Sequence, residues 1–261
     1  MRIVDFHAHV FPDRIALRAA GAISEFYGIP MQYDGTVGTL LALNDQCGIT
    51  MSLVHSVATV PQQVAAINDF IAEVVRLHPD RLAGFATIHP DHPAIEEEIE
   101  RAAFMGLRGV KIHSDFQRFL LDDERAMRIY RAIEGRLPIL VHAGDHRYEY
   151  SKAQRIARVL ERFPKLTMVC AHLGGWSEWE ESARILKGSG VLVDTSSSLY
   201  EMTSDQALGL IELYGADHVL FGTDYPMWDP QAELDLIERL GLTDSVREKI
   251  LHGNAERLFG L

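Results

Sequence analysis

Two histidines two residues apart, His7 and His9, stand at the end of a short apolar run near the start of the chain. Side chains alternate between the two faces of an extended strand, so both imidazoles point to the same side, where their nitrogens can bind one metal ion. A His-x-His pair alone is weak evidence, because histidine also occupies such positions without binding metal. The interpretation therefore depends on further ligands elsewhere in the chain.

Polar side chains also stand at the ends of the other short apolar runs. His142, His172 and Asp224 follow the fifth, sixth and eighth runs. The remaining runs carry His55, His89, Lys111, His113 and Asp194 at or near their ends. Charges buried without partners are costly, so such a gathering is hard to explain by chance. Because the ends of parallel strands meet at one face of a barrel, we expect these residues to form one site.

Four of these residues make a coherent set of metal ligands. The set provides three imidazoles and one carboxylate, from His7, His9, His142 and Asp224. Water would occupy the remaining position on the metal. A divalent ion lowers the pKa of its bound water towards about 7, and Asp224 can serve both as a ligand and as the base. His172 is either a fourth imidazole ligand or, as we favour, a free acid/base that protonates the leaving group. His172 and Asp224 are therefore the candidate catalytic residues.

Lys111 needs a partner, because a lysine at the end of a barrel strand is buried. It could form an ion pair with Asp5 or Asp194, bind a substrate carboxylate, or become carbamylated and bridge two metal ions. We favour the ion pair or the substrate over the bridge, so one metal ion is expected. His113, two residues further on, is assigned with Lys111 to substrate binding.

Two arginines lie on the loops that follow the fourth and fifth runs. Arg147 belongs to a polar stretch over residues 143–148, and Arg118 follows the fourth run. Together they could clamp an anionic substrate. Both could instead be solvated or paired with surface acids, an alternative that we favour slightly for Arg118. The expected substrate is accordingly small and anionic.

Apolar, β-branched runs alternate with longer amphipathic stretches along the chain, which indicates strands followed by helices. The predicted strands are residues 3–6, 51–57, 82–88, 107–112, 138–141, 166–171, 191–195 and 218–221. The predicted helices are residues 36–46, 61–77, 93–104, 123–134, 152–163, 177–187, 204–214 and 231–240. This alternation predicts an α/β protein, a (β/α)8 TIM barrel in one domain over residues 1–261. An open, doubly wound sheet is the alternative, because strand order cannot be read from sequence.

Two segments depart from this rhythm. Residues 11–37, after the first strand, are long and mixed, and could form a lid, one wall of the site, or a surface excursion with a helix at 14–27. Residues 245–259 are predicted to form two short helices that close the barrel.

The composition is that of a soluble globular protein of 261 residues, 47% hydrophobic and 24% charged. A formal net charge of −12 argues against nucleic-acid or anionic-membrane partners, which need clustered Lys and Arg. No stretch has the roughly 18 apolar residues that span a bilayer, and the first residues resemble no signal segment. We therefore expect a cytoplasmic enzyme with a small-molecule substrate, and a homodimer is left open.

Six motifs occur along the chain in an order typical of one enzyme family. They are VDFHAH (4–9), GVKIH (109–113), LVHAG (140–144), AHLGG (171–175), VDTS (193–196) and FGTDYP (221–226), followed by a closing GNAERLF (253–259). Together they resemble the amidohydrolase superfamily, in its amidohydrolase-related (amidohydrolase 2) branch, which includes aminocarboxymuconate-semialdehyde and γ-resorcylate decarboxylases. The resemblance spans nearly the entire chain.

The resemblance implies a distorted (β/α)8 barrel that holds one divalent metal ion, usually Zn2+, with Mn2+ or another divalent ion as the alternative. The matching ligands are His7, His9, His142 and Asp224, and His172 matches the catalytic histidine. Members either hydrolyse C–N, C–O or C–C bonds with a metal-activated water or decarboxylate carboxylated substrates.

The decarboxylases of this branch are generally longer, with a substrate-binding arginine after the second strand, where this chain has VATV over residues 57–60. We therefore expect a metal-dependent hydrolase first, and a non-oxidative decarboxylase of an aromatic or muconate-type acid second. A catalytically silent protein that uses the metal only to hold a ligand is the third hypothesis.

Overall fold

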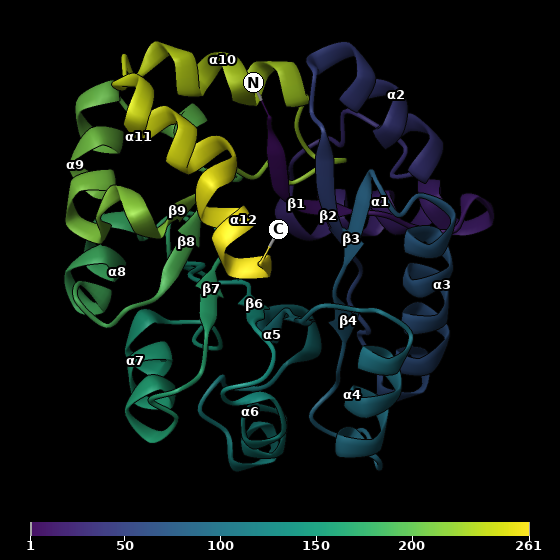
Figure 1. Ribbon diagram of the computed structural model, residues 1–261. Coiled ribbons are helices and arrows are strands. Elements are labelled where there is room, and N and C mark those ends of the chain that lie inside the picture. The colour runs from purple at the N-terminus through teal and green to yellow at the C-terminus, as the bar shows by residue number, and fades with distance from the viewer. Residues whose placement is uncertain (1, 261) are drawn as a thin grey trace.

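In the computed structural model, which describes residues 2–260, the strands form a closed parallel barrel (Figure 1). The strands are β1 (Val4–His9), β2 (Met51–His55), β3 (Leu82–Gly84), β4 (Ala86–Thr87), β5 (Val110–Ile112), β6 (Ile139–Val141), β7 (Met168–Cys170), β8 (Leu192–Asp194) and β9 (Val219–Leu220). β3 and β4 are two parts of one strand interrupted at Phe85, and neighbours pair in parallel in chain order.

The barrel closes between its first and last strands. Phe6 N donates to Phe221 O at 2.8 Å, and Asp224 N donates to His7 O at 2.8 Å. In an open, doubly wound sheet the first and last strands do not pair. The closed order therefore confirms the predicted (β/α)8 TIM barrel over the described residues, whereas Met1 and Leu261 of the predicted domain lie outside them.

Helices surround the barrel and follow nearly every strand (Figure 1). They are α1 (Asp13–Tyr27), α2 (Val37–Cys47), α3 (Val64–Leu77), α4 (Ile95–Phe104), α5 (Ser114–Gln117), α6 (Met127–Ile133), α7 (Ala153–Arg162), α8 (Trp179–Leu186), α9 (Ser204–Tyr214), α10 (Pro230–Arg239), α11 (Asp244–Glu248) and α12 (Asn254–Phe259). Short 3-10 turns are η1 (Pro61–Gln63), η2 (Glu124–Ala126), η3 (Leu199–Glu201) and η4 (Ala216–His218), and η5 (Lys249–Gly253) is a π-helical turn. Within residues 2–260, every helix is too short or too polar to cross a membrane.

Local sequence signals fix where several helices begin. Thr203 and Gln206 form a reciprocal capping box at the start of α9, and Thr36 caps α2 by accepting from Thr39 N. Asp229 caps α10, whose first residue is Pro230, a position where the missing N–H is not needed. These caps satisfy backbone donors that would otherwise lack partners, so each of these helices begins at a defined residue.

The amino-terminal end of the barrel is packed shut by the last helix. Phe259 of α12 stacks on Phe6 at 5.5 Å between ring centroids and meets Phe85 edge-on at 6.0 Å. α11, η5 and α12 follow one another directly, so one continuous helical segment replaces the two separate helices predicted for residues 245–259. Asn254 fixes it by donating to Val219 O at 2.6 Å. The opposite end of the barrel is therefore the one available for a site.

One further feature differs from the sequence-based expectation, and a second decides between alternatives that the sequence left open. The short helix α5 begins immediately after β5, in a stretch for which only a loop was predicted. The long segment after β1 contains α1, a helix of 15 residues that agrees with the helix expected at 14–27 to within one residue and is capped by Gly28 in the left-handed conformation, with φ of 69°. Three residues of this segment, Ile23, Tyr27 and Met31, line the cavity described below, so the segment forms a wall of the site.

Candidate active site

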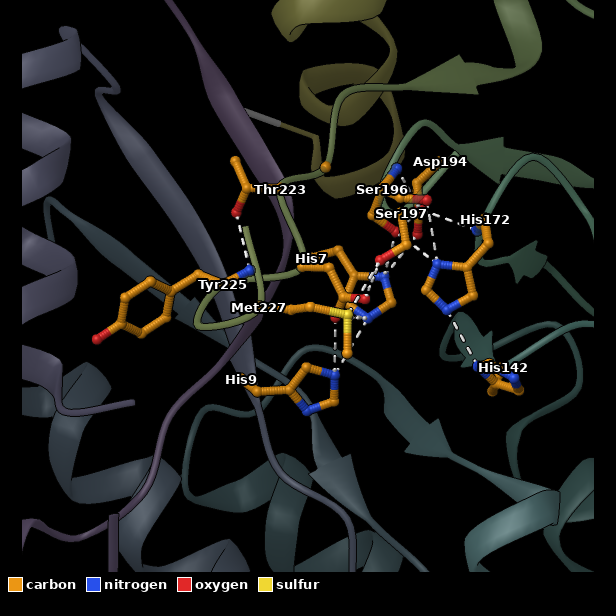
Figure 2. A network of polar contacts seen from close by, with 12 residues as sticks. His7, His9, His142, His172, Asp194, Ser196, Ser197, Thr223, Tyr225 and Met227 are labelled. Carbon is orange, nitrogen blue, oxygen red and sulfur yellow. Dashed lines mark hydrogen bonds and ion pairs between the residues drawn. The ribbon is translucent and has the colours of Figure 1, made fainter. Parts of the chain in front are cut away.

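Three of the four predicted ligands bring their donor atoms together. His7 and His9 end β1, and Asp224 lies in the loop after β9. His7 Nε2 and His9 Nε2 are 3.3 Å apart, and Asp224 Oδ1 lies 3.5 Å from the first and 3.4 Å from the second. Figure 2 shows the imidazoles of His7 and His9, which stand two residues apart on β1. We call these three atoms the donor triangle.

The dimensions and charges of the donor triangle fit a divalent ion. Ligands at about 2.0–2.1 Å from a tetrahedral ion lie about 3.3–3.4 Å from one another, which matches the edges of the triangle. Burial lowers the pKa of His7 to about 4, so its imidazole is neutral at pH 7. Although burial opposes ionisation, nearby His7 and His9 hold the pKa of Asp224 well below its usual range. Neutral imidazoles and an ionised carboxylate are the forms that bind metal.

A buried carboxylate, Asp194 at the end of β8, orients the histidines. Its Oδ2 lies 2.9 Å from His7 Nδ1, and its Oδ1 accepts from the backbone N–H of His172 at 3.1 Å. Burial opposes ionisation of Asp194, but His7 lowers its pKa to about 2. An ionised acceptor at Nδ1 keeps the hydrogen on that nitrogen and leaves the Nε2 lone pair free for the triangle.

Asp5, near the start of β1, fixes the loop that carries Asp224. Its carboxylate accepts from Thr223 N at 3.0 Å, from Thr223 Oγ1 at 2.7 Å and from His7 N at 3.0 Å. Asp224 itself has a positive φ of 57°, uncommon for a residue with a side chain. Ser197 Oγ donates to Asp224 Oδ2 at 2.5 Å. These contacts orient the carboxylate towards β1.

His142 and His172 face each other on the far side of the same cavity. Figure 2 shows the contact between His142 and His172. The atoms His142 Nδ1 and His172 Nε2 are 3.0 Å apart, and His142 Nε2 lies 3.8 Å from Asp115 Oδ2. His172 Nδ1 is held 3.1 Å from Ser196 O. His142 thus contacts His172 and not the donor triangle, and its role as fourth ligand stays a prediction.

Lys111 lies in β5 and His113 directly follows that strand, and both side chains line the cavity. Lys111 Nζ is fully buried and lies 3.4 Å from His7 Nε2, and burial lowers its pKa to about 8. Among the described residues it makes no ion pair with Asp5 or Asp194 within 4.0 Å, the partners considered from sequence. His113 stacks on His142 at 3.9 Å between centroids, and its Nε2 lies 2.8 Å from the hydroxyl of Tyr27.

The two arginines lie outside the cavity lining. Arg147 pairs with Asp145, with Nη2 at 2.7 Å from Oδ2, and donates from Nη1 to Phe26 O at 2.8 Å. Arg118 ends α5 and is exposed. The geometry therefore gives the predicted arginine clamp no support: Arg147 is engaged with protein groups and holds the end of α1.

A small cavity of about 20 Å³ lies over these donors. It is lined by His7, His9, Ile23, Tyr27, Met31, Lys111, His113, Phe116, His142, His172, Asp224, Pro226 and Met227. All the predicted metal-binding and catalytic residues, with Lys111 and His113, therefore meet in one place. A cavity of this size has room for about one water molecule.

Several residues of the site were not found from the sequence. Tyr27 comes from the long segment after β1, and Asp115 belongs to the unpredicted helix α5. Ser196 stands two residues after Asp194 and contacts both His7 Nδ1, at 3.1 Å, and His172 Nδ1, at 3.0 Å. Only Ser196 gave a usable signal, because it follows a strand-end carboxylate in the VDTS motif.

A closed parallel barrel whose strand ends gather buried imidazoles and carboxylates is typical of metal-dependent TIM-barrel enzymes. The amidohydrolase family model matches residues 4–261, so the chain belongs to the amidohydrolase family. This match confirms the resemblance drawn from the motifs.

Several of the similar proteins are named as decarboxylases. A γ-resorcylate decarboxylase of Polaromonas sp. is 24% identical over 251 residues, covering 74% of this chain and 75% of the relative. The 5-carboxyvanillate decarboxylase of Sphingomonas paucimobilis has a TM-score of 0.78 at 19% identity, covering 100% of this chain and 99% of that one. A dihydroxybenzoic acid decarboxylase of Polaromonas sp., with bound manganese and the inhibitor 2-nitroresorcinol, has a TM-score of 0.77 at 17% identity, covering 99% and 97%. The two structures share the fold of this chain.

Proposed function

We propose that this protein is a metal-dependent, non-oxidative decarboxylase of a hydroxylated aromatic acid. The structural observation that carries the proposal is that an acid/base histidine, His172, lines the same cavity as the donor triangle. Three relatives named as decarboxylases support this reaction. They favour the second of the two reactions expected from the sequence over hydrolysis.

The donor triangle would hold the metal. His7, His9 and Asp224 would bind a divalent ion, with His142 as the predicted fourth ligand. When bound, such an ion supplies a Lewis acid for the oxygen atoms of the substrate. The nitrogen-rich donors and edges of 3.3–3.5 Å favour zinc, whereas the Polaromonas relative holds manganese. Metal analysis of the purified protein by mass spectrometry distinguishes the two ions.

His172 would supply the proton that decarboxylation requires. Its Nδ1 faces the carbonyl oxygen of Ser196, which only accepts, so Nδ1 carries a hydrogen, and Nε2, which faces His142 Nδ1 at 3.0 Å, is the nitrogen that would transfer the proton. With both nitrogens protonated, His172 gives the Nε2 proton to the ring carbon that bears the carboxylate. The C–C bond then breaks, its electron pair restores the aromatic ring, and CO2 leaves. Asp224, which stays ionised, would accept the proton of a phenolic hydroxyl.

Charge in the cavity also fits an acid substrate. Lys111 is the only lysine or arginine that lines the cavity within residues 2–260, and it is fully buried. A cation in such a low-dielectric place attracts a carboxylate more strongly than one in water. We therefore assign the recognition of substrate charge to Lys111 rather than to Arg118 or Arg147.

The test is a substrate panel offered to the metal-loaded protein. Dihydroxybenzoic acids, 5-carboxyvanillate and muconate-type acids are incubated with it, and CO2 and the decarboxylated product are quantified. A parallel panel of lactones and amides measures hydrolysis. We expect CO2 release from at least one hydroxylated aromatic acid. Hydrolysis of a lactone or amide without CO2 release from any acid would overturn the proposal in favour of a hydrolase.

A further inference from the structure

The wall formed by the α1 segment leaves too little room for a ring. The cavity of about 20 Å³ holds about one water molecule, whereas sites for organic ligands are typically about 300 Å³ or more. A second cavity of about 10 Å³ lies beside it and shares His142, His172 and Asp224 with the first. Tyr27 and Met227 also line both cavities. Tyr27 comes from the α1 segment, so its displacement would widen the space that the two cavities share.

α1 buries few of its side chains, and a separate set of contacts holds its last two residues, Phe26 and Tyr27. Only Ala16 and Ala20 of α1 are buried, whereas α3, of similar length, buries Val64, Asn68, Ile71, Ala72 and Val74. Arg147 donates to the carbonyl of Phe26 at 2.8 Å, and its guanidinium lies 5.2 Å from the ring centroid of Tyr27. Asp145 holds that guanidinium with two oxygens. Arg147 is therefore a positioning residue for Tyr27.

Hydrogen bonding leaves the hydroxyl hydrogen of Tyr27 unused. Phe116 N donates to His113 Nδ1 at 3.4 Å, so in the neutral ring the hydrogen sits on Nε2. His113 Nε2 then donates to the Tyr27 oxygen, 2.8 Å away. Within the described residues Tyr27 has no other hydrogen-bond partner, so its own O–H remains available to an acceptor in the cavity.

We infer that Tyr27 is a specificity-determining residue, which moves aside to admit a ring-shaped acid and then donates its hydroxyl to an oxygen of that ligand. This inference rests on the proposed function, because it takes the ligand to be an oxygen-bearing aromatic ring. The His113 contact orients the phenol while leaving its hydrogen free, and the aromatic neighbours Trp176, at 5.2 Å, and Phe116, at 5.9 Å, provide apolar surface for a ring.

The experiment measures binding of 2-nitroresorcinol to the metal-loaded protein by calorimetry. Tyr27→Phe keeps the ring and removes the hydroxyl, and we expect its Kd to rise about tenfold, the typical net value of one hydrogen bond. The matched control is Tyr148→Phe, since Tyr148 stacks on Phe26 at 5.5 Å but lies outside the cavity lining. Its Kd should equal that of the parent. Arg147→Met should raise Kd by a smaller factor.

Metal content and melting temperature are recorded for each variant, and both should match the parent. An unchanged Kd for Tyr27→Phe overturns the inference, as does loss of metal or a lowered melting temperature in that variant, because the hydroxyl would then serve the fold. If the parent binds the probe through Tyr27 but releases no CO2 from any acid, the proposed function fails and the inference holds. If the parent binds neither the probe nor a dihydroxybenzoic acid, both fail.

Discussion

Asp194 governs the geometry of the donor triangle although it is not one of its atoms. It accepts from His7 Nδ1 and from the backbone of His172, and it is fully buried. Loss of such a partner to a metal-bound histidine typically costs 10- to 100-fold in affinity. We expect Asp194→Asn to weaken metal binding by about that factor, measured by chelator competition. Asp205→Asn, on the exposed start of α9, is the control and should change nothing.

His172 is expected to act in the reaction and not in metal binding. If it donates the proton, His172→Asn should lower kcat by about 100-fold or more while the metal content stays at the parent level. His142→Ala should instead lower the metal content, because His142 is the predicted fourth ligand. Retention of metal by His142→Ala would show that the ion is held by the donor triangle alone. Turnover by His172→Asn at the parent rate would remove the histidine from the mechanism.

The strand-end residues could be predicted because the period of a strand and the polarity of a barrel place them together. His7, His9 and Asp224 needed only the knowledge of which strand each ends. Tyr27 and Asp115 could not be predicted, because their positions depend on the paths of loops and on a four-residue helix. The contact between His142 and His172 depends on side-chain rotamers, which no periodicity encodes.

Among the secondary-structure elements, α12 should contribute to the stability of the fold without affecting metal binding at the site. Phe259→Ala removes the ring that packs on Phe6 and Phe85 at the closed end of the barrel, and it should lower the free energy of unfolding by about 2–4 kcal/mol. Phe104→Ala, at a ring 93% exposed, should change it by less than about 0.5 kcal/mol. Urea denaturation measures both. Metal affinity should be equal in the two variants, since the donors lie at the other end.

Elements long enough to show a period were the ones that the sequence predicted. The predicted helix at 204–214 is α9 (Ser204–Tyr214), and the predicted helix at 14–27 differs from α1 by one residue. The third predicted strand, 82–88, is divided at Phe85 into β3, which pairs with β2, and β4, which pairs with β5. Such a division depends on pairing between strands, which local periodicity does not determine.

The folded protein as a unit should respond to acid through its buried histidines. Burial lowers the pKa of His7 to about 4, and the pKa of His55, His113 and His142 is also held well below 6.5. Between about pH 6.5 and 4 the unfolded chain therefore binds more protons at these residues, so their contribution to stability falls as pH falls.

Three buried carboxyls act in the opposite direction. Burial raises the pKa of Asp5 and of Asp115 to about 7 and that of Glu233 well above its usual range, so their contribution to stability rises as pH falls from 7 towards 4. The histidines outnumber them, and we expect the metal-free protein to melt several degrees lower at pH 5 than at pH 7. Scanning calorimetry at the two pH values measures this, and equal or higher melting at pH 5 would contradict it. Metal-loaded protein should show a larger difference, because its ligands must be deprotonated.

The seam between β1 and β9 differs from every other junction in the barrel, because no intervening helix connects its two strands directly. His9 stands on one side of that seam and Asp224 on the other. An ion held by both would join the two ends of the fold, much as a covalent crosslink does. The chain cannot bind the ion through both His9 and Asp224 until β9 has docked on β1. Metal uptake would then be a late event in folding, and a bound ion would indicate that the barrel is closed.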